Sequence, residues 1–97
     1  MDLINQPERF DELPEERKEI LLKWISNNLL PIRSFNTHYT SYSIKQWIED
    51  DYFTNGEFKG AMLAAGYKVQ DKTKDNWVFN ISQRSPIIMK LKFKGEL

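Results

Sequence analysis

The side chains that could do chemistry in this sequence are amides and cations between residues 55 and 84. Asn55 and Lys59 lie about one helical turn apart in the stretch NGEFKG. An asparagine can read adenine with two hydrogen bonds, and a lysine can reach guanine or a phosphate. Further cations could contact phosphates, namely Lys68, Lys72, Lys74 and Arg84. These residue types indicate binding to nucleic acid rather than catalysis.

Residues of the kinds that enzymes and metal sites use are sparse. His38 is the only histidine and cysteine is absent, so a metal site built on histidine or thiolate is not expected. The glycines do not have the spacing of a phosphate-binding loop, and no serine lies in a G-x-S-x-G context. We therefore expect no catalytic residues, no cofactor and no small-molecule substrate.

The length of the chain and its charge limit which architectures and which partners are possible. The 97 residues are enough for one small domain, and we take residues 1–97 as that single domain. Net charge is zero, but residues 1–28 hold seven acids and four bases, whereas residues 29–97 hold seven acids and ten bases. The lack of cysteine, of a secretory signal and of a bilayer-spanning apolar run predicts a cytoplasmic protein away from membranes.

The clearest element is a helix at 55–65. Thr54 and Glu57 have the spacing of a capping box, and Gly66 supplies a helix end. The apolar face repeats at helical intervals, with Phe58, Ala61, Met62 and Ala65. Asn55 and Lys59 belong to the opposite face, which we expect to be open.

Two more helices are expected before it. Pro14 and the apolar stripe that follows predict a helix at 14–28. Ser41 or Ser43 could cap another at 43–50, followed by the short connection Asp51-Tyr52-Phe53. Trp47, Phe58, Met62 and Trp77 are expected to be mostly buried.

After Gly66 the apolar pattern changes to a period of two. It predicts a β-hairpin with strands at 67–69 and 76–82 around the polar turn Asp71–Asn76. Residues 31–35 could add a short strand, 1–13 form an extended lead-in, and 83–97 form a basic tail or an edge strand. The expected fold class is α+β, a small winged helix-turn-helix of three helices with a β-hairpin wing.

The stretches NGEFKGAMLAAGY and NWVFNIS resemble a small family of proteins carried by phages and mobile elements. The resemblance covers roughly residues 40–82. Proteins of this kind are found near replication and integration genes, and the broader likeness is to winged helix-turn-helix domains, which bind DNA or dock on proteins. The resemblance brings no catalytic residues.

Two functions follow from these features. The first is a non-catalytic accessory protein of a phage or mobile element, which binds duplex or single-stranded DNA, a replication enzyme such as a polymerase, primase or helicase, or both. Tyr39 and Tyr42 could then stack on bases. The alternative is a docking module that inhibits or redirects a host enzyme without contacting DNA. Its docking face would include Gly60, Leu63 and Tyr67.

Overall fold

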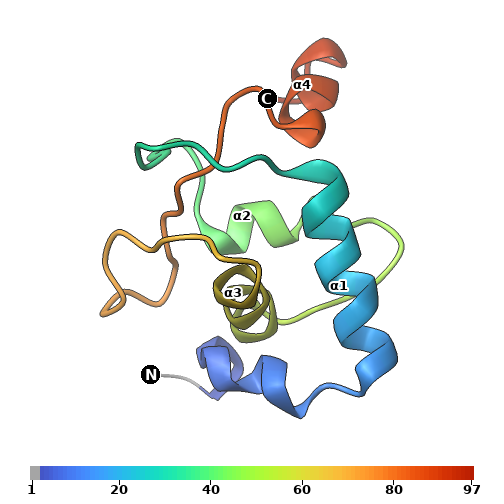
Figure 1. Cartoon of the computed structure of the whole chain (residues 1–97). Coiled ribbons are helices and arrows are strands. Elements are labelled where there is room, and N and C mark those ends of the chain that lie inside the picture. The colour runs from blue at the N-terminus through green and yellow to red at the C-terminus, as the bar shows by residue number, and fades with distance from the viewer. Residues whose placement is uncertain (1–2) are drawn as a thin grey trace.

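Helix α3 (Asn55–Ala64) lies at the centre of the computed structural model, which describes residues 3–97 (Figure 1). The capping box forms as expected: the Thr54 N–H donates to Glu57 Oε1 over 2.8 Å, and the Glu57 N–H donates to Thr54 Oγ1 over 3.2 Å. Gly66 has φ +90°, and the N–H groups of Gly66 and Tyr67 close a Schellman motif on Leu63 and Met62. The predicted helix and its glycine end are therefore confirmed to within one residue.

One face of α3 builds the apolar core. Phe58 is fully buried and meets the rings of Trp24 and Phe79 edge-on, at centroid distances of 6.5 and 6.3 Å. Met62 and Trp77 are also buried, as predicted, whereas Trp47 is only partly buried.

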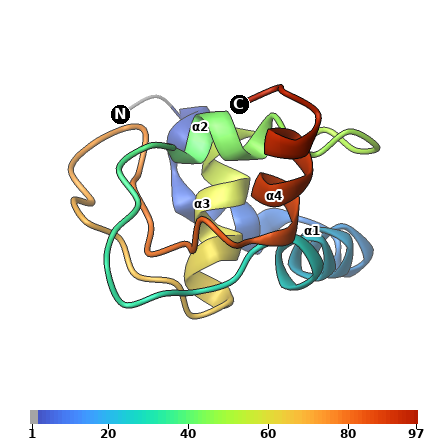
Figure 2. The same cartoon turned by 90° about the horizontal axis from the view of Figure 1, so that it is seen from above.

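The opposite face of α3 is covered by the start of the chain. Two short 3-10 helices, η1 (Leu3–Asn5) and η2 (Pro7–Glu12), form here, so the extended lead-in predicted for 1–13 is wrong from residue 3 onwards, and residues 1–2 lie outside the described part of the chain. They approach closely because Gly56 and Gly60 have no side chain: a Cβ on either would lie within 3 Å of backbone atoms of this segment. Figure 2 shows η1 and η2 beside α3.

The first two predicted helices form with different bounds. Helix α1 (Glu15–Asn28) begins just after Pro14 and buries Leu21 and Ile25. Helix α2 (Ser41–Lys45) is shorter than the predicted 43–50, and its cap is Thr40, which makes a capping box with Ser43. Residues 46–54 therefore separate α2 from α3, a longer connection than the 3–4 residues typical of a helix-turn-helix.

The predicted β-hairpin wing is wrong. Residues 3–97 contain no sheet and only two isolated antiparallel bridges, Pro31 with Ile81 and Val69 with Phe79. The chain is therefore a helical domain with long ordered connections, not an α+β winged helix.

Backbone bonds join the bridged segments at single points, such as the Gln70 N–H to the Val78 carbonyl, and side chains take other hydrogen bonds that a strand ladder would use. Asn80 accepts from the Lys68 N–H over 2.7 Å and donates to the Ile32 carbonyl over 2.9 Å, so one amide joins both flanking segments. Pro31 has no N–H to offer a neighbour. The Asp75 carbonyl is turned towards α3, where Lys59 donates to it over 2.8 Å. The backbone of the expected wing is thus held in irregular positions.

The end of the chain folds as helix α4 (Pro86–Phe93), where an edge strand or basic tail was expected. Ser85 precedes it, Pro86 occupies its first turn, and Gly95 ends it with φ +74°. Its inner face buries Ile87, Ile88 and Leu91. The alternation of apolar residues with lysines at 89–94 had indicated a strand, but Ile87 and Leu91 are spaced one helical turn apart.

Candidate functional site

Lys59, predicted to face a ligand, is inside the protein. Its side chain is 0% exposed, and Nζ donates to the carbonyls of Asn5 and Asp75 over 2.7 and 2.8 Å. The ammonium also lies 4.3 Å from the centroid of the Trp77 ring. Burial lowers the pKa of Lys59, while the carboxylates of Asp75 and Glu8 partly oppose this. Lys59 therefore ties three segments together and cannot reach a base or phosphate in this conformation.

Asn55 belongs to the same buried polar cluster. Its exposed fraction is 4%, and Nδ2 lies within 3.0 Å of the Asn5 side-chain oxygen, the Asp75 carbonyl and the Asn76 side-chain oxygen. The expectation that Asn55 and Lys59 lie on an open recognition face is therefore wrong. The physical reason is that η1 and η2 occupy the space that a nucleic acid would need.

The alternative docking face is closed for the same reason. Gly60 lies under Pro7 and Phe10, and Tyr67 is buried, which raises the pKa of its hydroxyl. Only Leu63 of that set is exposed, beside a hollow that it shares with η2. This face offers a partner one apolar side chain.

Lys68, Lys72 and Lys74 are exposed, as a phosphate-binding surface requires. They lie on the connection between Gly66 and Trp77, which also carries Asp71 and Asp75. Hydrogen bonds from Thr73 lower the pKa of Asp71 and keep it ionised. The carboxylates thus offset part of the positive charge of these three lysines.

Arg84 is exposed at a different place, the end of the molecule that carries α4. Residues 29–40 and 77–97 contain five bases and a single acid, Glu96. We call the surface that carries these five bases the basic end. The bases are Arg33, Arg84, Lys90, Lys92 and Lys94. All five are exposed, and none is in an ion pair with another described residue.

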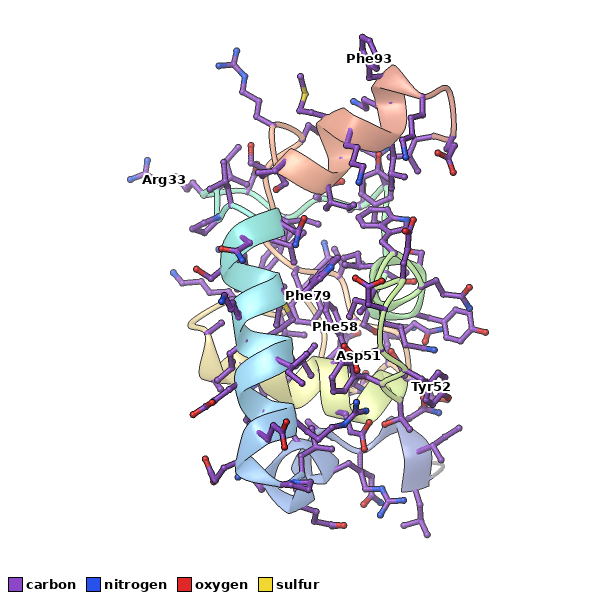
Figure 3. The ribbon with its side chains drawn as sticks, turned by 90° about the vertical axis from the view of Figure 1, so that its right-hand side faces the viewer. Arg33, Asp51, Tyr52, Phe58, Phe79 and Phe93 are labelled. Atoms are coloured by element: carbon purple, nitrogen blue, oxygen red, sulfur yellow. The ribbon has the colours of Figure 1, made fainter. Side chains whose placement is uncertain are left out.

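Apolar side chains project from α4 among its three lysines. Met89 and Phe93 are one helical turn apart on the outer side of α4, and Phe93 is 93% exposed (Figure 3). Lys90 and Lys94 follow one flank of this pair and Lys92 the other. The sequence analysis placed these lysines only in a basic tail or an edge strand, and it did not single out Phe93 or Arg33. Pro86 and Gly95, read as the two ends of a helix, would have placed Phe93 and the three lysines on α4, whereas no local signal places Arg33 beside them.

A hollow of about 540 Å³ adjoins the basic end. Phe35, His38 and Arg84 are among the residues that line it. Phe35 is partly exposed there, so a second aromatic ring lies within the basic end.

No other chemistry stands out among residues 3–97. They contain no cluster of three or more histidine, cysteine, aspartate or glutamate side chains that could hold a metal ion. Within the same range, no helix has the length and apolar character needed to cross a bilayer. Tyr42 is exposed, whereas Tyr39 packs edge-on against Trp47 and is not open for stacking on a base.

Comparison with known proteins adds no relative: no family model, curated protein or solved structure matches the chain.

Proposed function

We propose that this protein is a non-catalytic accessory protein that binds single-stranded nucleic acid on its basic end. The observation that carries this proposal is that five exposed cations, none of them in an ion pair with a described residue, lie at the end of the molecule from which the ring of Phe93 protrudes. Cations neutralise phosphates, and exposed aromatic rings stack on unpaired bases, which are the two elements of single-strand binding. Duplex DNA would leave Phe93 without a base to stack on.

Under this proposal the nucleic-acid-binding surface differs from the recognition helix and wing that the sequence predicts. The recognition helix of the predicted winged helix is α3, and α3 is enclosed by the rest of the chain. The role in the replication or control of a mobile element, implied by the resemblance of residues 40–82, belongs to the same proposal. The protein would there hold a strand without acting on it chemically.

Binding to a single-stranded oligonucleotide over a range of salt concentrations tests the proposal. Five phosphate contacts give a slope of log K against log salt of at most about −3.5, from about 0.7 per contact. Changing Arg84, Lys92 and Lys94 together to glutamine should weaken binding and flatten the slope by about 2. The matched control changes Lys68, Lys72 and Lys74 to glutamine, removes the same charge, and should have a smaller effect.

Phe93→Ala separates stacking from charge. It should weaken binding by about 1–3 kcal/mol and leave the salt slope unchanged. Equal effects of the two triple variants would mean diffuse attraction rather than a site. Absence of binding at low salt, or a preference for the duplex, would overturn the proposal.

A further inference from the structure

A groove of about 410 Å³ runs between α1, the 46–54 connection and α4. Figure 3 looks towards this side of the molecule, with α1 and α4 bordering the connection that carries Asp51 and Tyr52. Its apolar lining comes from all three elements, namely Ile20, Trp24, Trp47, Ile48, Ile87 and Leu91. The volume lies within the range of about 300–1,000 Å³ that is typical of binding pockets.

The two indole rings in this groove are held in place from behind. Trp24 meets Phe58 edge-on at 6.5 Å between centroids, and Trp47 meets Tyr39 edge-on at 5.1 Å. Both indoles remain partly exposed. Side chains that are ordered before binding lose little entropy on binding, and tryptophan is enriched among residues that dominate interface energy.

Opposite charges border the apolar lining. Glu49, Asp50 and Asp51 line the groove on the 46–54 connection, whereas Lys23 and Lys90 line it on α1 and α4. Arg17 pairs with Asp51 over 3.1 Å. The other four charges make no ion pair with a described residue. The groove thus has acidic side chains on the 46–54 connection and basic side chains on α1 and α4, and of these five charges only Asp51 is paired.

We infer that this groove docks an amphipathic helix of a partner protein, with basic side chains along one flank and acidic side chains along the other. An apolar helix face laid into a groove is a common mode of peptide recognition. The separated charges of the groove favour this partner helix, because its basic side chains would face Glu49 and Asp50 and its acidic side chains would face Lys23 and Lys90. A nucleic acid or an anionic lipid surface would be repelled by the acidic side chains. The inference does not depend on the proposed binding of nucleic acid.

Synthetic helical peptides without tryptophan provide the probe. The test peptide carries an apolar stripe with lysines on one flank and glutamates on the other. The control peptide has the same composition, with lysines and glutamates interleaved on both flanks. Titration is followed by the fluorescence of Trp24 and Trp47, since Trp77 is buried away from solvent. The segregated peptide should bind about tenfold more tightly, because several charge pairs of a few tenths of a kcal/mol to about 1 kcal/mol add up.

Two substitutions of equal exposure locate the contact. Ile20 and Leu63 are each 36% exposed, on α1 and α3 respectively. Ile20→Glu should lower affinity for the segregated peptide at least tenfold, whereas Leu63→Glu should leave it unchanged. Circular dichroism checks that both variants remain folded. Glu49→Lys combined with Asp50→Lys should remove the preference for segregated charges.

Three results would overturn the inference. The first is equal affinity for the segregated and interleaved peptides, which would indicate unspecific apolar contact. The second is loss of binding in Leu63→Glu but not in Ile20→Glu, which would place the contact on α3. The third is no binding of the segregated peptide at about 1 mM, the range of the weakest complexes. Lys90 belongs to both the groove and the basic end, but none of these results measures binding of nucleic acid.

Discussion

Gly60→Ala should destabilise the protein, although alanine is the better helix former. In an open helix the change would stabilise by about 1 kcal/mol. Here a Cβ on Gly60 would lie within 3 Å of the Pro7 carbonyl oxygen and of Phe10 Cβ, and the backbone of η2 would have to move. Overpacking of this kind costs about 1–3 kcal/mol. If η1 and η2 instead detach together, the buried ring of Phe10 loses about 1.5–3 kcal/mol of burial and Lys59 loses its bond to Asn5.

Because the clash involves backbone, we expect the upper half of the overpacking range, and after the gain of about 1 kcal/mol in helix propensity the net loss in the free energy of unfolding should be about 1–2 kcal/mol, a fall in Tm of roughly 5–10 °C for a domain of this size. Urea and thermal unfolding measure it. Gly66→Ala is the control: no atom lies within 4 Å of its Cβ, and the cost of about 1 kcal/mol comes from the positive φ alone. Limited proteolysis should cut near residues 3–12 in Gly60→Ala but not in Gly66→Ala. An unchanged or raised Tm for Gly60→Ala would refute the packing of η2 on α3.

Three further substitutions test the core and its polar contacts. Phe58→Ala should cost about 3–5 kcal/mol in urea unfolding, because the ring is fully buried; a loss below about 1 kcal/mol would contradict its place in the core. Asn80→Ala should cost about 1–3 kcal/mol, since the Lys68 N–H and the Ile32 carbonyl lose their partner; a neutral effect would mean that water replaces the amide. Lys59→Met tests the lowered pKa of Lys59. Between that lowered value and the ordinary value of about 10.4, the unfolded chain binds more protons than the folded one, so stability rises with pH in the wild type. The free energy of unfolding of the wild type minus that of Lys59→Met should therefore increase from about pH 7 to about pH 9.5. A decrease over this range would exclude the lowered pKa of Lys59.

Local signals in the sequence were enough to place two helices and part of the core. The capping box of Thr54 and Glu57, the helical spacing of Phe58 and Met62, and Gly66 act within a few residues of one another. Such signals do not depend on the rest of the fold, and α3 appears within one residue of its predicted bounds. Pro14 marked the start of α1 in the same way.

The prediction of a β-hairpin wing was wrong because an apolar pattern with a period of two is an ambiguous signal. Trp77, Phe79 and Ile81 are buried, as the period of two predicts. Burial of alternate side chains does not require a partner strand when Asn80 can satisfy the flanking backbone groups. The same ambiguity hid α4, where the lysines between Met89 and Phe93 imitate an edge strand.

The sequence alone determined where α1 and α3 form, that Phe58 and Trp77 enter the core, and how charge divides along the chain. Only the tertiary structure decided which polar residues remain accessible. Asn55 and Lys59 are enclosed because residues 3–12, some fifty positions away in sequence, pack on the two glycines of α3. Arg33 and Arg84 join the lysines of α4 because the segments that carry them meet at one end of the molecule. Accessibility depends on contacts between distant segments, and local patterns do not encode them.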